Sequence, residues 1–247
     1  GALPAMSPHG SVIRAHMAKR LGLTNPDHCW HTLRDRILTI AATLAGTVGA
    51  TAKIAGDCLL MMQAEVAELQ EGKPGTSTSM PQKKNPVHVL IPVAALPIAA
   101  AQISAITAAQ LHPHERAPGQ WHSEWISLPL LSTLALVSAE RLKDMLHHLD
   151  VNSSRMKLNV ANTNGSLGSE ELVQTLRGIL GRSKAHSLIK TLSYQTGGET
   201  FAERILCDQT LRKLIPEKTL RNILDYKRPL AASVSEARRL SSQLMDP

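Results

Sequence analysis

The segment from Gly75 to Pro86 contains the residues best suited to chemistry in this sequence. It has four hydroxyl side chains in a row, at residues 76–79, and then two lysines and Asn85. Consecutive Ser and Thr residues are poor helix formers and favour a mobile loop. An apolar helix is expected to begin directly afterwards, so its first backbone N–H groups, the amide of Asn85 and the ammonium of Lys83 predict a carboxylate-binding site. A solvated surface loop with an asparagine cap is the alternative that these features leave open.

A second group of candidate residues flanks the expected long helices. Arg34 offers a planar fork of donors that matches a carboxylate, and Thr32 lies two residues before it. A helix cap and a solvated charge are the equally weighted alternatives for these two residues. His114 and Arg116 lie in a connecting segment and are candidates for the same pocket, although helix-end capping or an intersubunit ion pair is the favoured interpretation of Arg116.

Long helices must position these two groups. Apolar residues recur at helical spacing without an intervening proline, and polar, glycine-containing or proline-containing segments separate the runs. Long helices are therefore expected over residues 32–71, 85–111 and 118–149. Trp121 and Trp125, four residues apart, are expected to pack in the core from one face of the third helix. A shorter helix over 11–21 should end at Gly22, a typical helix-stop residue.

The character of the chain changes near residue 150. Later segments are shorter and more polar, which predicts a long-helix bundle over residues 1–150 and a small C-terminal helical domain over 151–247. Aromatic residues make up only 2% of the chain, so the core is built from small and flexible side chains that favour closely spaced helices over packed sheets. The expected fold class is all-α.

Composition narrows the range of partners. The formal charge of +7 comes from scattered Lys and Arg, and one Phe and two Tyr provide no base-stacking platform, so a small polyanionic substrate is favoured over nucleic acid. Residues 87–109 are apolar enough to span a membrane, but the prolines and polar residues within them favour the centre of a helix bundle. Neither the three cysteines nor His31, His114 and His122 have metal-ligand spacing, so reduced thiols in a cytoplasmic protein without a bound metal are expected.

Residues 76–85, Thr-Ser-Thr-Ser-Met-Pro-Gln-Lys-Lys-Asn, resemble the fumarase/aspartase superfamily signature Gly-Ser-x-x-Met-x-x-Lys-x-Asn. Every specified position matches except the first, where Thr76 replaces Gly. The resemblance implies that Ser77 abstracts a proton from the carbon next to a carboxylate after its loop closes, while Lys83 and Asn85 hold the carboxylate. Loop closure would exclude water, and nearby Lys would stabilise the alkoxide that a serine base requires.

Two further segments resemble the bacterial carboxymuconate cycloisomerase branch of that superfamily. They are Trp-His-Thr-Leu-Arg-Asp-Arg at residues 30–36 and the His-Glu-Arg…Trp-His-Ser-Glu-Trp run at 114–125. Leu90 stands where fumarases and adenylosuccinate lyases usually carry a Glu, which also agrees with the cycloisomerase branch. The resemblance extends through nearly the whole chain and is weakest after Asn152.

This resemblance implies a cofactor-independent enzyme that adds a carboxylate across a muconate double bond to form a lactone. It also implies active sites that use segments from three subunits. A homotetramer is expected because the long helices leave more apolar surface than one chain can cover. Gly1-Ala2-Leu3 resembles the point just after the upstream region that supplies the acid partner in that superfamily, so this chain is expected to lack part of the active site. A related lyase of the adenylosuccinate or argininosuccinate type and a non-catalytic helical assembly module remain alternatives.

Overall fold

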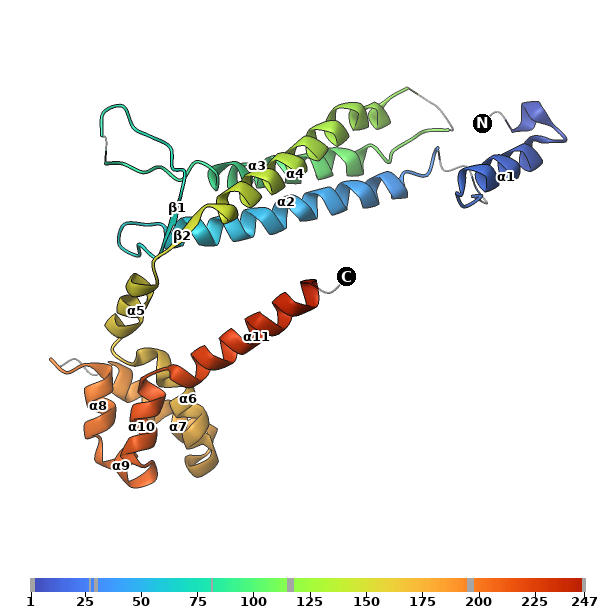
Figure 1. The fold of residues 1–247 in the computed structure, drawn as a ribbon. Coiled ribbons are helices and arrows are strands. Elements are labelled where there is room, and N and C mark those ends of the chain that lie inside the picture. The colour runs from blue at the N-terminus through green and yellow to red at the C-terminus, as the bar shows by residue number, and fades with distance from the viewer. Residues whose placement is uncertain are drawn as a thin grey trace. The chain divides into compact units, whose positions relative to one another are not determined.

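The computed structural model describes residues 3–26, 28, 31–80, 82–114, 118–194 and 198–245. The chain divides into two compact units, Gly1–Asn152 and Ser153–Pro247. Helices dominate both units, so the expected all-α class is confirmed. Figure 1 shows the course of the chain through the described elements.

Three long helices form the body of the first unit. They are α2 (Asp35–Met61), α3 (Leu90–Ala108) and α4 (Glu124–His147), and each packs against the other two. The shared core is rich in alanine, which allows close approach of the helix backbones. Its buried members are Ala41, Val48, Ala95, Ala99, Ile106, Leu131 and Ala135. Shorter elements of this unit are η1 (Pro4–Met6), α1 (Gly10–Leu21) and η2 (Gln120–Ser123).

The first long helix is shorter than its periodicity predicted. The expectation of a helix over 32–71 is wrong, because α2 ends at Met61 and Ala67 takes a left-handed φ of 51° in the turn that follows. Leu69–Glu71 then forms strand β1, which pairs antiparallel with β2 (Leu149–Val151). The partner strand lies about eighty residues away in sequence, so a local helical period could not predict this ladder.

The other two long helices also begin later in the sequence than the expected residues 85 and 118. α3 begins at Leu90 instead of residue 85, and α4 begins at Glu124 after the 3₁₀ turn η2. The expected stop of the first short helix is confirmed, since Gly22 caps α1 in the left-handed conformation with φ 65°.

The second unit has its own core, formed by buried side chains of several short helices. Its elements are α5 (Ser153–Asn162), η3 (Ser166–Gly168), α6 (Ser169–Leu180), α7 (Arg182–Tyr194), α8 (Phe201–Cys207), α9 (Gln209–Leu214), α10 (Glu217–Leu224) and α11 (Lys227–Met245). Leu172, Leu176, Ile205, Leu211 and Leu220 are fully buried together. Helix α8 begins with a capping box, in which Thr200 and Glu203 bond reciprocally to each other's backbone N–H.

Two of the described helices, α2 and α3, are long and apolar enough to cross a membrane. Both pack against each other and against α4 in the first unit. A core helix of a soluble protein can have the same length and composition, so these two properties do not show whether α2 and α3 cross a membrane.

Candidate active site

The segment that carries Ser77 is a loop closed at its neck by two backbone hydrogen bonds. The Gly75 N–H donates to the Asn85 carbonyl at 2.8 Å, and the Asn85 N–H donates back to the Gly75 carbonyl at 3.0 Å. Within the loop, the Met80 N–H donates to the Ser77 Oγ at 3.2 Å. Lys83 is exposed, whereas Ser77 and Asn85 are half-buried. The residues of the resembled signature therefore share one loop and its neck.

Gly75 lies close to the Val87 side chain at this neck. A Cβ added there would lie 2.5 Å from the Cγ1 of Val87, closer than real contacts allow. Thr76, which replaces the signature glycine, is not among the described residues with a positive φ. A β-branched residue is therefore compatible with the observed backbone at position 76.

The entrance to α3 is occupied by a carboxylate of the protein itself. Glu71, only 2% exposed, accepts backbone hydrogen bonds from Val87, His88 and Val89 at 3.0–3.2 Å. The expectation that this entrance offers free N–H groups to a substrate is wrong, because β1 delivers Glu71 to the same donors.

A cavity of about 310 Å³ lies at the root of the loop. Its polar lining includes Gln70, Lys84 and Asp150, and Lys84 Nζ donates to the Gln70 side-chain oxygen at 3.1 Å. Ser77, Lys83 and Asn85 do not line this cavity. It is therefore a feature of the loop's base and not a pocket formed by the candidate catalytic residues.

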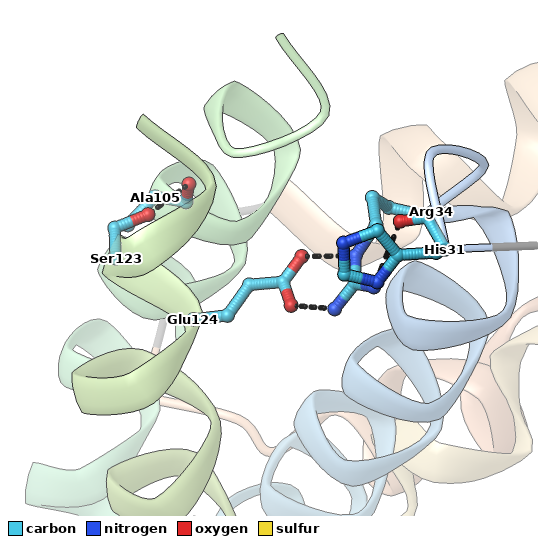
Figure 2. A network of polar contacts seen from close by, with 5 residues as sticks. All are labelled: His31, Arg34, Ala105, Ser123 and Glu124. Carbon is cyan, nitrogen blue, oxygen red and sulfur yellow. Dashed lines mark hydrogen bonds and ion pairs between the residues drawn. The ribbon is translucent and has the colours of Figure 1, made fainter. Parts of the chain in front are cut away.

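The second candidate group centres on an ion pair at the start of α2 and α4 (Figure 2). The Arg34 Nε donates to Glu124 Oε1 at 2.9 Å, and the Arg34 Nη2 contacts the other carboxylate oxygen. The Arg34 Nη1 also donates to the His31 carbonyl at 3.2 Å. The side chains are 10% and 5% exposed, and the hydrogen bond to Glu124 raises the pKa of Arg34 against the opposing effect of burial. One edge of the guanidinium that was predicted to bind substrate is thus occupied by Glu124.

A cluster of aromatic and imidazole rings lies beside this pair, with the Trp121 ring centroid 6.0 Å from the Arg34 Cζ. Trp121 lies at the centre, with its ring centroid 4.0–5.8 Å from those of His31, His112, His122 and Trp125. The core-packing prediction fails for Trp125, which is 67% exposed although its ring lies against those of Trp121 and His122. The described residues contain no group of three or more metal-ligating side chains.

Thr32 and His114 lie near the same end of the bundle. Thr32 is half-buried, and His114 is exposed with a left-handed φ of 53°. Arg116 lies outside the described residues. The substrate-binding roles of these three residues stay predictions.

The two candidate groups lie at opposite ends of the three-helix bundle (Figure 1). Helix α2 begins beside Arg34 and ends near the root of the Ser77 loop, and its 27 residues span about 40 Å at 1.5 Å per residue. A single chain therefore does not bring Ser77 and Arg34 into one pocket.

Sequence reasoning missed two functional candidates, Glu71 and Glu124. Glu71 was counted within an expected helix, and nothing in its local pattern marked it as the cap of another element. Glu124 lies in the 114–125 segment that resembles the cycloisomerase branch, but its pairing with Arg34 depends on the packing of α2 against α4.

No family model matches the chain, but individual relatives do. A 3-carboxy-cis,cis-muconate cycloisomerase of Bradyrhizobium diazoefficiens is 37% identical over 225 residues, covering 88% of this chain and 50% of the relative. The crystal structure of the 3-carboxy-cis,cis-muconate lactonizing enzyme from Pseudomonas putida matches with a TM-score of 0.75 and 29% identity, covering 98% of this chain and 56% of that one. A fumarate lyase structure from Mesorhizobium matches with a TM-score of 0.76 and 26% identity, over 91% and 51% of the two chains. The chain thus spans about half the length of the curated relatives it matches.

Proposed function

Because this chain belongs to the fumarase/aspartase superfamily, we propose that it forms part of a 3-carboxy-cis,cis-muconate cycloisomerase. The observation that supports the proposal is the closed-neck loop, which carries Ser77, Lys83 and Asn85 in the order of the resembled signature. The substrate would be a small polycarboxylate, and the reaction would need no cofactor. Residues 1–150 would serve as the central bundle domain and 151–247 as the C-terminal helical domain.

In the lactone-opening direction, Ser77 would take the proton from the carbon next to a carboxylate. The lactone C–O bond would then break, its electron pair leaving with the carboxylate oxygen as the muconate double bond forms. Lactone formation reverses these steps, with the carboxylate adding to the double bond and Ser77 returning the proton. Lys83 and Asn85 would hold the substrate carboxylate and stabilise the charge that develops beside it.

The arrangement of the two candidate groups supports a site shared between chains. Ser77 and Arg34 lie at opposite ends of one bundle, so a homotetramer in which the loop of one copy meets the Arg34 end of another would bring both groups to one substrate. Thr32, Arg34, His114 and Arg116 would line that second side of the site.

Exposed apolar side chains on the long helices support such an assembly. Large residues that are 40–74% exposed include Ile40 and Leu60 on α2, Leu90 and Ile98 on α3, and Ile126 and Leu136 on α4. Exposed apolar side chains that form contiguous patches in an assembly are typical of protein interfaces. We expect sedimentation to give four times the mass of the chain; a stable monomer would contradict the homotetramer.

The direct test is turnover of the carboxymuconate and its lactone by the complete gene product that contains this chain. Ser77→Ala should lower turnover about a hundredfold or more, because the general base is lost. Ser79→Ala removes an exposed hydroxyl of the same loop and should leave turnover unchanged. Full activity in Ser77→Ala would contradict the assigned role.

Intersubunit complementation tests the shared site. Ser77→Ala copies and His114→Asn copies, each inactive alone, should regain about a quarter of wild-type turnover when mixed, since half of each segment is intact and sites combine segments from different copies. Asn tolerates the left-handed backbone at position 114, so this change removes only the imidazole. If each site were formed within a single chain, the mixture would have no activity, because every copy carries one of the two inactivating changes.

The runner-up is a related lyase that cleaves a C–N or C–O bond. Leu90 at the entrance of α3 disfavours it, and a panel of succinyl-bearing substrates would separate the two activities. A non-catalytic assembly module would form the oligomer but turn over no member of the panel.

We also expect cell fractionation to recover the protein in the cytoplasm. The recovered protein should contain no tightly bound metal.

A further inference from the structure

The Glu71 carboxylate fills an anion-binding position formed by backbone N–H groups at the entrance of α3. Its Oε1 accepts from His88 and Val89, and its Oε2 accepts from Val87 and His88. Three consecutive N–H groups at a helix entrance form the arrangement that elsewhere binds phosphate or a substrate carboxylate. Here a buried side chain satisfies all three donors.

Glu71 itself is held firmly from the other side. It is the last residue of β1, where it pairs with Leu149 of β2. The next residue, Gly72, donates its N–H to the His148 carbonyl at 2.7 Å, and a Cβ on Gly72 would lie 2.2 Å from that oxygen. The carboxylate therefore links the end of α4 to the entrance of α3.

The donors to Glu71 begin two residues after Asn85. Because Asn85 also forms the neck with Gly75, both ends of the Ser77 loop are tied to the same backbone frame. These contacts hold Gly75 and Asn85 at the two ends of the segment that carries Ser77 and Lys83.

We propose that Glu71 is a positioning residue for the catalytic loop, acting through the backbone of Val87–Val89 on Asn85 and the loop neck. The proposal rests on the function proposed above, since it assigns Glu71 no contact with substrate. It predicts that a bound carboxylate is required at this position, and that the carboxylate need not be covalently attached.

Chemical rescue tests this requirement. Glu71→Ala removes Cγ and the carboxylate, which leaves room for formate beside the three donors. Hydrogen exchange of residues 75–89 should accelerate in this variant and slow again, saturably, as formate is added, while chloride at equal ionic strength does less. Glu71→Gln fills the same space but turns a donor toward the Val87 N–H, so exchange should accelerate without rescue. Glu140→Ala, on the exposed surface of α4, is the matched control and should change nothing.

Turnover by the complete gene product provides the second readout. Glu71→Ala should lose about a hundredfold in kcat through misplacement of the loop, with a smaller change in KM, and formate should restore it. Glu71→Asp keeps the charge but reaches fewer donors, so its kcat should lie between those of the wild type and Glu71→Ala. It replaces Glu71→Ala as the test variant if the alanine variant does not fold.

Unchanged exchange over 75–89 in both Glu71→Ala and Glu71→Asp would overturn the inference, as would accelerated exchange with no specific response to formate. If the wild type turned over no carboxymuconate, the proposed function would fail, whereas the exchange experiment would still report whether Glu71 fixes the loop neck.

Discussion

Arg34 and Glu124, separated by 90 positions in the sequence, form a two-bond fork that joins the starts of α2 and α4. Ser123, next to Glu124, also donates its hydroxyl to the Ala105 carbonyl near the end of α3 (Figure 2). This end of the bundle is therefore fixed by polar contacts among all three long helices. Its rigidity would hold Thr32 and His114 in place for a partner chain.

Removing one member of the Arg34–Glu124 pair should destabilise the protein strongly. Glu124→Ala leaves a guanidinium almost buried without its carboxylate, and about 3–5 kcal/mol of unfolding free energy should be lost. Urea denaturation followed by circular dichroism measures the effect. The double variant Arg34→Met/Glu124→Leu should recover much of it, because no unpaired charge remains. Equal losses in the single and double variants would contradict this account.

A methyl group at position 72 should be far more damaging than one on an open helix surface. Gly72→Ala would force a Cβ to 2.2 Å from a backbone oxygen, so the β1–β2 connection must shift, at a cost of about 3 kcal/mol or more. Gly178→Ala in α6 meets no atom within 4 Å and should stabilise by about 0.5–1 kcal/mol through helix propensity. Thermal unfolding of the two variants tests the contrast; a tolerated Gly72→Ala would disagree with the observed backbone approach.

The capping box of α8 should make the second unit sensitive to acid. Hydrogen bonds from the Thr200 backbone and side chain lower the pKa of Glu203. A carboxyl whose folded pKa is depressed contributes stability above its unfolded pKa, and the contribution is lost as pH falls through the folded value. Glu203→Gln should therefore flatten the stability profile below about pH 4.5 while retaining the cap geometry. Acid titration of the α8 amides by NMR measures this stability. Parallel profiles for the wild type and Glu203→Gln would show that protonation of Glu203 does not affect stability.

The two described cysteines should react at very different rates. Burial, with a smaller contribution from Asp57, raises the pKa of the Cys58 thiol, so little thiolate forms near neutral pH. Cys207 is exposed and free. Iodoacetamide at pH 7.5 should label Cys207 at least about tenfold faster than Cys58, as followed by peptide mass spectrometry. Labelling of Cys58 should approach that of Cys207 only after denaturation; comparable rates in the folded protein would show that Cys58 is accessible.

The sequence alone determined what depends on neighbouring residues. The hydroxyl-rich break before α3, the left-handed stop at Gly22, the all-α class and the signature residues around Ser77 could be identified because turn chemistry, helix capping and motif spacing are encoded locally. The ends of the long helices could be predicted only approximately, since apolar spacing continues past Met61 into a strand.

Only the tertiary structure decided which groups meet. Glu71 reaches Val87–Val89, and Arg34 reaches Glu124, through the packing of elements that are distant in sequence. The same packing sets Ser77 and Arg34 at opposite ends of one bundle. Contacts of this kind depend on where whole helices and strands lie, and their energies arise from burial and from hydrogen bonds that no local window contains.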